Sequence, residues 1–429
     1  MKVPISLTEY FSADLLQAML STLIEHELLE SEEAFHSNRF LNRSVVPHIK
    51  NLSERFNRLS DQKVSDHYWK GSSNPQNLRM AYLLHFMPAN LYRMACVWTE
   101  LNRLGFQWPK QNQLRAVELG AGPGSATSGI AIAESISESK NSSLPEQLKW
   151  TWIERDSQMM KLGQTWNQKL FQMKNKPWTI QKNHQKLDLS QPLFDRKTPA
   201  FDLWVSSYFL NEIEDTPEDL AQYLIAQWKT HLNKNGIVIL IEPALKKESR
   251  KFLSFREALL KQVEQERKFS LQVITPCLGN QKCGALMEPE DWCHEVVRWW
   301  RPDYYKKLDQ LSGLNRKDLP FSYLVLTRDR RPIEDILPTL SNTSSNKRHR
   351  LVSPSYATGR DSEFYLCGQE GKTKAQIRLQ KEEVPTRGDI LLGTELEGMD
   401  HRPRRVLSVD SVLNIEGKHP VQLIPKRNA

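Results

Sequence analysis

Residues 115–134 read RAVELGAGPGSATSGIAIAE, and this stretch decides the fold. A short apolar run leads into glycines at Gly120, Gly122 and Gly124, and a run of small and apolar residues follows. Glycine lets the backbone turn sharply and lets a ligand lie against it, while the start of a helix offers free N–H donors. The stretch therefore predicts a strand, a ligand-binding glycine loop and a helix, with a purely structural turn as the alternative.

The spacing of the glycines and the acid before them separate the candidate ligands. A dinucleotide fingerprint ends in G-x-x-G and places a pyrophosphate on the helix start, where a preceding acid is unfavourable. Here the last gap is G-x-G, and Glu118 precedes the loop, where it could accept hydrogen bonds from an ammonium group. A ligand with a cationic amino-acid end fits better than a diphosphate. The pattern resembles motif I of the class I S-adenosylmethionine-dependent methyltransferases.

In that superfamily, acids at the ends of the next two strands contact the cofactor. WTWIERDSQMM offers Glu154 for the ribose hydroxyls, with Asp156 as its rival, and SESKNSSLPEQ reads as an inserted loop that lengthens the gap from the glycines. KLDLS places Asp188 where such enzymes contact the adenine, and a turn or helix cap is an equal alternative. The resemblance implies S-adenosylmethionine as cofactor, bound by Glu118, Gly120, Gly122, Gly124, Glu154 and Asp188.

From Arg115 onward, short β-rich runs alternate with helical ones. The expected strands are RAVELG, KWTWIER, TIQKNHQKLDL, FDLWVSSYF, GIVILIEP, SLQVITP and FSYLVLTR. Continuous apolar runs suit strands buried on both faces, and alternation with helices implies a mostly parallel sheet. The predicted fold class is α/β, with a class I methyltransferase (Rossmann-like) doubly wound sheet, a helical N-terminal region and a small C-terminal β domain.

The chain is expected to divide into four segments. Pro88 should end one helix and begin another, since proline lacks the N–H that a helix interior uses. After Arg331, LPTLSNTSSNKRHRLVSPS reads as a linker, and EFYLCG, KAQIRLQ, DILLGTEL, RRVLSVDSVLNI and HPVQLI read as short strands. The predicted boundaries are 1–75 for the helical region, 76–330 for the core with a cysteine-rich insertion at 275–310, 331–357 for the basic linker and 358–429 for the β domain.

Composition narrows the class of protein. The 429 residues are 39% hydrophobic and 26% charged, as in ordinary globular proteins, and the formal net charge of +8 favours a polyanionic partner. No apolar run is long enough to span a bilayer, and the start MKVPISLTEYFSADLL resembles neither a signal nor a transit peptide. We therefore expect a cytoplasmic protein that does not enter a membrane and is monomeric.

The fourth expected strand ends in SSYFLNEIED, where an open α/β sheet presents its active site. Asn211 and Glu212 could contact the substrate there, although Asn-Glu after a strand is also favourable chemistry for a helix start. The Asn-Pro-Pro-Tyr type of sequence, which holds target nitrogens in many amino-group methyltransferases, is not present. Methyl transfer from a sulfonium needs mainly alignment and no obligatory base. The sequence therefore identifies no catalytic residue.

Three of the five cysteines lie in TPCLGNQKCGALMEPEDWCHE, with the spacing C-x5-C-x9-C, and Cys367 follows in FYLCGQEG. No C-x2-C pair of the zinc-finger type is present, so the spacing alone leaves metal ligands and unrelated residues open. Pro276-Cys277 is similar to the nucleophile of some RNA methyltransferases. Those cysteines follow the fourth and fifth strands, whereas Cys277 follows the sixth expected strand, so this role is not favoured. Cys96, among apolar neighbours on a helical run, is expected to be buried.

Several segments together resemble the methyltransferase-like family of small-ribosomal-subunit assembly proteins of mitochondria and bacteria. These segments, in order, are ELGAGPG, SSYFLNEIED, LIEPALKKESRKFLSFREALL, TPC, DWCH and FSYLVL, with fainter matches at YLCGQEG and RGD. In that family four cysteines hold an iron–sulfur cluster, which here implies the ligands Cys277, Cys283, Cys293 and Cys367. Four thiolates suit a [4Fe–4S] cluster, with zinc as the alternative occupant. PCLG and KCGA depart from the family pattern around the cysteines.

The resemblance implies the small ribosomal subunit and its rRNA as partners. VVRWWRPDYYKK interleaves basic and aromatic residues, as nucleic-acid contacts require, and about half of its rings are expected in the core. The linker residues Lys347, Arg348 and Arg350 and the tail sequence HRPRR are the preferred phosphate contacts, with solubility as the alternative explanation.

Two functional hypotheses follow. The first is an S-adenosylmethionine-dependent methyltransferase that acts on small-subunit rRNA. The second is a non-catalytic iron–sulfur assembly factor with a degenerate methyltransferase core. A methyltransferase of small molecules ranks third, because the cysteines and the basic tail count against it.

Overall fold

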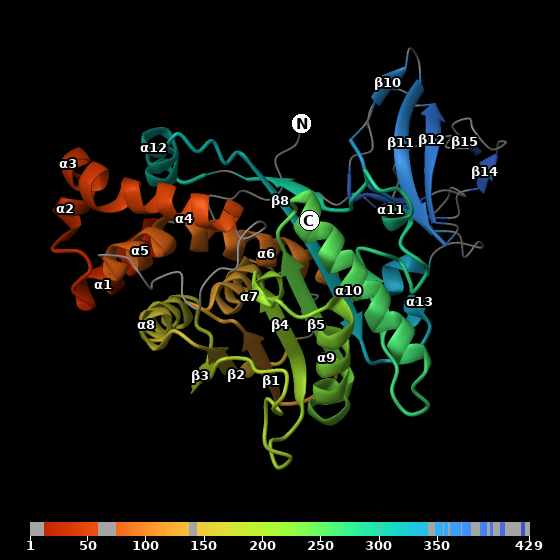
Figure 1. Cartoon of the computed structure of the whole chain (residues 1–429), viewed down its shortest axis with the longest axis horizontal. Coiled ribbons are helices and arrows are strands. Elements are labelled where there is room, and N and C mark those ends of the chain that lie inside the picture. The colour runs from red at the N-terminus through yellow and green to blue at the C-terminus, as the bar shows by residue number, and fades with distance from the viewer. Residues whose placement is uncertain are drawn as a thin grey trace.

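The computed structural model describes residues 13–58, 74–136, 144–299, 301–341, 348–354, 356–358, 361–369, 371–378, 387–392, 395–397, 404–407 and 422–424. Figure 1 shows the N-terminal helices, in red and orange, on one side of a central sheet and the C-terminal strands, in blue, on the other. In these parts of the chain no helix combines the length and hydropathy that a membrane crossing requires.

The central sheet has the order β3-β2-β1-β4-β5-β8-β6, with β7 paired to β8. β1 to β5 run parallel, and β8 is antiparallel to its neighbours β5, β6 and β7. The strands are β1 (Gln113–Leu119), β2 (Gln147–Glu154), β3 (Thr179–His184), β4 (Phe201–Ser207), β5 (Leu232–Glu242), β6 (Gln272–Thr275), β7 (Glu295–Arg298) and β8 (Asp318–Thr327). This order confirms the predicted doubly wound sheet of a class I methyltransferase fold, and β7 is a strand that the sequence did not predict.

Helices cover both faces of this sheet, which explains the continuous apolar runs in its strands. In β5, Ile237, Ile239 and Ile241 belong to one hydrophobic cluster, whereas Val238 and Leu240 belong to another. Because successive side chains point to opposite faces, a strand covered on both sides needs apolar residues at every position. The covering helices are α7 (Ser125–Ile136), α8 (Ser157–Met173), α9 (Pro217–His231) and α10 (Lys246–Glu264).

The N-terminal region is helical, as predicted. Its elements are α1 (Ala13–Glu25), α2 (Glu32–His36), α3 (Asn38–Phe40), the π-helix η1 (Leu41–Val45), α4 (Val46–Arg58), α5 (Pro75–Ala81), the π-helix η2 (Tyr82–Phe86) and α6 (Met87–Arg103). Pro88 lies in the first turn of α6, where its missing N–H costs little. The π-helix η2 directly precedes α6. The break predicted at Pro88 is therefore a change from π-helix to α-helix, without a connecting loop.

After β6 the chain forms α11 (Gly284–Met287) and α12 (Asp303–Ser312), and after β8 it forms α13 (Ile333–Ile336) and the 3₁₀ turn η4 (Pro338–Leu340). The C-terminal sheet follows with the order β14-β15-β12-β11-β9-β13-β16 and with β10 paired to β11. Its strands are β9 (Arg348–Leu351), β10 (Tyr356–Thr358), β11 (Asp361–Gly368), β12 (Gly371–Arg378), β13 (Ile390–Leu392), β14 (Glu395–Glu397), β15 (Arg404–Leu407) and β16 (Gln422–Ile424). The predicted small β domain is therefore present.

The basic linker contains a strand that the sequence analysis missed. Arg348 and Arg350 lie on β9 and are only 5% and 2% exposed. The prediction that they are exposed phosphate contacts is therefore wrong. Arg348 pairs with Glu334 and Arg350 with Glu100, so both charges are neutralised within the protein. Lys347 lies outside the described residues, as do His401, Arg402 and Pro403 of the tail.

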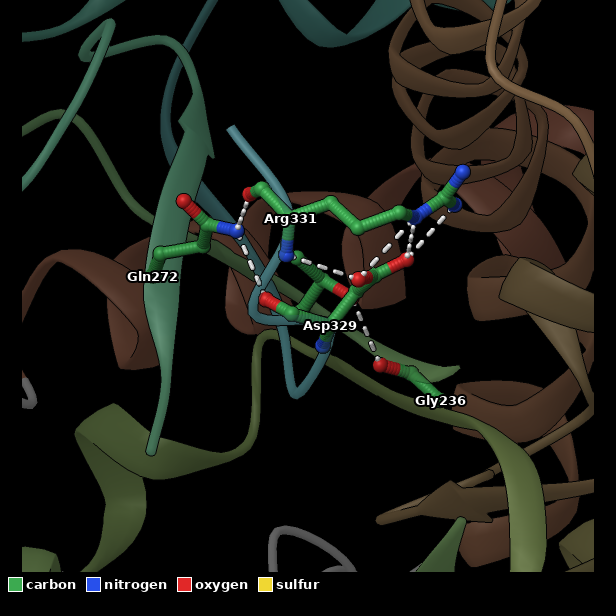
Figure 2. A network of polar contacts seen from close by, with 5 residues as sticks. Gly236, Gln272, Asp329 and Arg331 are labelled. Atoms are coloured by element: carbon green, nitrogen blue, oxygen red, sulfur yellow. Dashed lines mark hydrogen bonds and ion pairs between the residues drawn. The ribbon is translucent and has the colours of Figure 1, made fainter. Parts of the chain in front are cut away.

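A polar network fastens the end of β8 to its neighbouring strands (Figure 2). The side-chain amide of Gln272 on β6 donates to the carbonyl oxygens of Asp329 and Arg331 at 2.6 and 2.8 Å. Thr327 Oγ1 donates to the carbonyl of Gly236 on β5 at 3.1 Å, and the Arg331 guanidinium binds the Asp329 carboxylate at 2.7 Å. These contacts hold the segment that follows β8 against β5 and β6.

Asp329→Asn is expected to lower the free energy of unfolding by about 1 kcal/mol at neutral pH, since charge-assisted hydrogen bonds are lost. Burial alone would raise the pKa of Asp329, but hydrogen bonds from Arg331 hold it below its usual value. Because the pKa of Asp329 is lower in the folded than in the unfolded protein, its carboxylate stabilises the fold at any pH above the unfolded pKa of about 3.9. This contribution is lost as the pH falls through the pKa of the folded state. In urea unfolding, the difference between wild type and variant should therefore shrink below about pH 4, and a constant difference would contradict this account.

Candidate functional site

A cavity of about 1040 Å³ lies at the carboxyl ends of β1, β2 and β4. The glycine loop comes from β1, Glu154 from β2, and Ser207, Tyr208 and Phe209 from the end of β4. Helical residues from the N-terminal region, Tyr82 and Arg93 among them, close its other side. Open α/β sheets bind their ligands at this edge, where the order of the strands reverses.

The three glycines of the loop have different tasks, although all adopt positive φ angles of 62°, 53° and 74°. A Cβ at Gly120 would lie 2.4 Å from the Phe209 ring, and a Cβ at Gly124 would lie 2.2 Å from the Trp152 ring. Gly122 has nothing within 4 Å of the corresponding position, and it lines the cavity. Two glycines thus allow close packing, whereas Gly122 leaves room for a ligand.

Glu118, which was predicted to accept hydrogen bonds from a ligand ammonium group, is buried on β1. Its carboxylate is 1% exposed and accepts hydrogen bonds from the backbone N–H groups of Ala126 and Thr127, both at 3.1 Å, and from Thr127 Oγ1 at 2.6 Å. Burial raises the pKa of Glu118 to about 7, against the effect of these hydrogen bonds. The carboxylate caps the start of α7 and does not line the cavity, and its contact with a ligand stays a prediction. Because it occupies these helix-start donors, they are not free for a diphosphate.

Glu154 is the acid of β2 that stands over the glycine loop. Its carboxylate accepts the N–H of Gly122 at 2.9 Å and that of Asp156 at 2.8 Å, and burial raises its pKa. Asp156 caps α8 through Gln158 N and Met159 N and forms a 3.0 Å ion pair with Arg79. Both acids line the cavity, but Glu154 keeps acceptor capacity for a ligand hydroxyl.

Asp188 lies in the loop after β3 and also lines the cavity. Its carboxylate accepts the backbone N–H of Ser190 at 2.9 Å and its hydroxyl at 2.8 Å, and the hydroxyl hydrogen bond lowers its pKa. The sequence left two roles open for Asp188, an adenine contact and a turn residue. They are compatible, because Asp188 forms a local turn and also lines the cavity.

The end of β4 is held by an acid that the sequence analysis did not single out. Glu242, the last residue of β5, accepts hydrogen bonds from the backbone N–H groups of Phe209, Leu210 and Asn211 at 3.3, 2.9 and 3.1 Å. Burial raises the pKa of Glu242 to about 8. Glu242 could have been recognised in the sequence as the one charged residue of the otherwise apolar run GIVILIEP.

The loop after β4 places polar groups at the cavity. Tyr208 has a φ of 59°, an uncommon conformation for a residue with a side chain, and such strain concentrates at functional sites. Asn211 Oδ1 is buried and has no hydrogen-bond partner among the described residues. Glu212 pairs with Arg155 at 3.2 Å. Asn211 does not cap a helix, because it lies inside the short 3₁₀ helix η3 (Leu210–Glu212), whose N-cap is Phe209, and Thr216 caps α9.

The cysteines predicted as ligands lie together in a second, smaller pocket of about 50 Å³. Cys277 follows β6, Cys283 precedes α11, Cys293 precedes β7, and Cys367 reaches the pocket from β11 of the C-terminal sheet. Burial raises the pKa of Cys367 to about 12, and it also raises the pKa of Cys283 and Cys293, with neighbouring thiols adding to the effect. Thiolates at this site would need a positive partner.

The side chains around these cysteines bear on whether the pocket is a metal-ion site. Throughout the described residues, no group of three or more His, Cys, Asp or Glu side chains is placed to hold one metal ion. Cys277 lines the small pocket and not the large cavity, so it is not placed as a nucleophile for a substrate there. Cys96 lies on α6 and packs against the core, but it is half-buried, whereas the prediction was a buried residue.

The aromatic and basic segment after Cys293 is divided between core and surface. Trp299 and Tyr305 are buried at 7% and 0% exposure, and Tyr304 is partly buried against the core, so all three described rings of this segment pack inward. Arg301 pairs with Asp309, Lys306 pairs with Asp303 at 2.9 Å, and Arg298 is exposed at the end of β7. Trp300 lies outside the described residues.

No protein-family model and no curated protein sequence matches the chain. Among solved structures, the plantazolicin methyltransferase BpumL with S-adenosylhomocysteine and a desmethylplantazolicin analogue aligns at 12% identity and a TM-score of 0.33, over 65% of this chain and 99% of that one. The CurJ carbon methyltransferase aligns at 14% identity and 0.31, over 74% and 80%. The Methanococcus jannaschii fibrillarin pre-rRNA processing protein aligns at 13% identity and 0.26, over 51% and 68%. The strand order, and not these scores, gives the chain its class I methyltransferase fold.

Proposed function

We propose that the large cavity binds S-adenosylmethionine and that the chain transfers its methyl group to rRNA of the small ribosomal subunit. The observation that carries the cofactor assignment is the open space in front of Gly122, directly beside the Glu154 carboxylate. An extended cofactor can lie against the glycine loop there, with a ribose hydroxyl donating to Glu154 and the adenine beside Asp188. When bound, the cofactor supplies an electrophilic methyl group.

The protein contributes alignment more than acid or base chemistry. Glu242 fixes three successive N–H groups after β4 and so holds Tyr208 and Asn211 at the cavity. Holding an acceptor in line with a methyl group supplies a large part of the rate enhancement in such transfers. The unpaired Oδ1 of Asn211 could orient a donor group on the acceptor. These residues position the acceptor and exclude water from it.

The rRNA assignment rests on the resemblance to the ribosomal assembly family and on the net charge of +8. Calorimetry with S-adenosylmethionine should show binding to the wild-type chain, and a flat titration would defeat the cofactor assignment. Methylated nucleotides in the small-subunit rRNA should then be mapped in a deletion strain. Loss of one modification would support the enzyme. Defective subunits with an unchanged map would support the alternative of a non-catalytic assembly factor.

We also propose that the cysteine pocket holds a [4Fe–4S] cluster. Four cysteines from distant segments of the chain line one pocket, as a shared ligand set requires. Thiolates on one zinc ion lie within bonding distance, about 2.3 Å, of a common point, whereas a cluster binds each thiolate at a different iron. The choice of a cluster over zinc rests on the resemblance to the ribosomal assembly family, in which four cysteines hold an iron–sulfur cluster. Lys372 and Arg256 line the same pocket and place positive charge beside the anionic cluster.

Protein purified without oxygen is expected to be brown and to carry about four irons per chain. Cys367→Ser should remove most of this iron, because the one ligand contributed by the C-terminal sheet is lost. Cys96→Ser provides the matched control, since Cys96 packs against the core and should leave the iron content unchanged. Iron and zinc would be measured by elemental analysis, and stoichiometric zinc without iron would rule out the cluster.

A further inference from the structure

Two arginines line the large cavity and form no ion pair among the described residues. Arg93, on α6, is 7% exposed, and Arg316 comes from the loop between α12 and β8. Arg93 Nη1 donates to Asn90 Oδ1 at 2.8 Å, but its Nε is buried and has no partner in the described chain. The Arg316 guanidinium lies 4.7 Å from the centre of the Phe86 ring. Ring stacking orients this charge without neutralising it.

The Asp309 carboxylate, which contacts the backbone of Arg316, is already engaged by other side chains. Asp309 pairs with Arg301 and with His85 at 3.0 Å, and it also accepts the backbone N–H of Arg316 at 3.1 Å. Burial lowers the pKa of Arg316, and the charge of Arg93 contributes to this shift. Two cations that share a half-buried wall are unfavourable unless an anion joins them.

The end of β4 adds further polar groups beside this pair. The Arg93 guanidinium lies 5.3 Å from the centre of the Tyr208 ring. The Tyr208 hydroxyl and Ser207 Oγ are buried, and neither has a hydrogen-bond partner in the described parts of the chain. Tyr208 also has the strained backbone described above. Unsatisfied buried polar atoms are costly, and at a functional site they indicate a ligand group that completes them.

We propose that Arg93 and Arg316 form a subsite for a phosphodiester group of the substrate, beside the loop where the methyl acceptor would lie. This inference rests on the proposed function and assigns residues of the cavity to the phosphodiester backbone of its rRNA substrate. The planar guanidinium groups match phosphate oxygens in two-point hydrogen bonding. The cavity volume of about 1040 Å³ reaches the top of the range of small-molecule pockets, so a nucleotide can lie beside the cofactor.

The test is a binding titration with the full chain saturated with S-adenosylhomocysteine. The probe is a dinucleoside monophosphate, compared with the same dinucleoside joined by a neutral methylphosphonate. Arg316→Gln is expected to weaken binding of the charged probe by about 10- to 100-fold, the value of charge-assisted hydrogen bonds. Wild type should bind the methylphosphonate as weakly as the variant binds the phosphodiester. Arg316→Lys, which keeps the positive charge but loses the two-point hydrogen bonding of the guanidinium, should give an intermediate affinity.

Arg115→Gln is the matched control, because Arg115 also stacks on a ring, that of Phe201 at 5.3 Å, and does not line the cavity. Its affinity for the phosphodiester should equal that of wild type. Equal affinity of Arg316→Gln and wild type for the charged probe would overturn the subsite. Loss of S-adenosylhomocysteine binding in Arg316→Gln would assign the anion to the cofactor carboxylate and would also overturn it. If wild type binds no S-adenosylhomocysteine, the proposed function fails. The subsite is then still tested by comparing the affinities of the free protein for the phosphodiester and the methylphosphonate.

Discussion

Gly122→Arg is expected to reduce the affinity for S-adenosylmethionine by at least about 100-fold, which corresponds to about 2.7 kcal/mol. The Cβ position of Gly122 has no atom within 4 Å, so a new side chain meets no protein atom at its base and enters the cavity. The arginine would occupy the space in front of the loop, and its charge would repel a sulfonium. Calorimetry with the variant is the measurement, since it needs no knowledge of the methyl acceptor.

Backbone strain must be separated from this effect, since Gly122 has a φ of 53° and a side chain there is strained. Gly313→Arg is the matched control: Gly313 has a φ of 75°, also has no atom within 4 Å of its Cβ position, and ends α12 at an exposed site. Both variants should show a similar fall in melting temperature, but only Gly122→Arg should lose cofactor binding. Full binding by Gly122→Arg would place the cofactor elsewhere.

The fold could be predicted from the sequence where one physical pattern dominated. Strands such as β5 are covered on both faces and therefore appear as unbroken apolar runs. β7 and β9 were missed because each is only four residues long, and each lies in a segment whose basic residues were interpreted as nucleic-acid contacts. Arg350 illustrates the limit, since a buried arginine depends on a partner 250 residues away.

The candidate site was predictable in part for similar reasons. Gly122 and Glu154 lie where their motifs placed them, because a strand, a glycine loop and a helix form one local unit. Glu118 also lies where its motif placed it, but its carboxylate turns to the start of α7. Arg93 could not be predicted, because an arginine on an amphipathic helix is normally exposed. Its position depends on how α6 packs against the loop after β4.

A buried ionic cluster joins the C-terminal sheet to the core, next to the cysteine pocket. Arg350 on β9 pairs with Glu100 on α6, and it also donates to Thr275 Oγ1 at 3.1 Å. Thr275 and Tyr323 donate to the same Glu100 oxygen at 2.7 and 3.1 Å. Each charged partner is 3% exposed or less. Burial alone would lower the pKa of Arg350, but Glu100 raises it above its usual value, so the guanidinium stays charged.

The same helix serves both pockets. α6 carries Arg93 at the large cavity and, two turns later, Glu100 at the joint with the C-terminal sheet. Arg350 lines the cysteine pocket as well, so loss of the joint should affect the position of Cys367 on the adjacent strand. A variant at this joint is therefore expected to change both stability and metal content.

Glu100→Ala is expected to lower the free energy of unfolding by about 3–5 kcal/mol, because it leaves the Arg350 charge buried without its acid. The double variant Glu100→Leu with Arg350→Met should be less destabilised than Glu100→Ala, since replacing both charges with apolar groups removes the unpaired ion. Denaturant unfolding measures both losses, and iron analysis tests whether the proposed cluster site keeps Cys367 in place. Asp303→Ala is the control, because its ion pair with Lys306 is exposed and should contribute little. Equal losses in Glu100→Ala and Asp303→Ala would show that the buried pair does not hold the C-terminal sheet to the core.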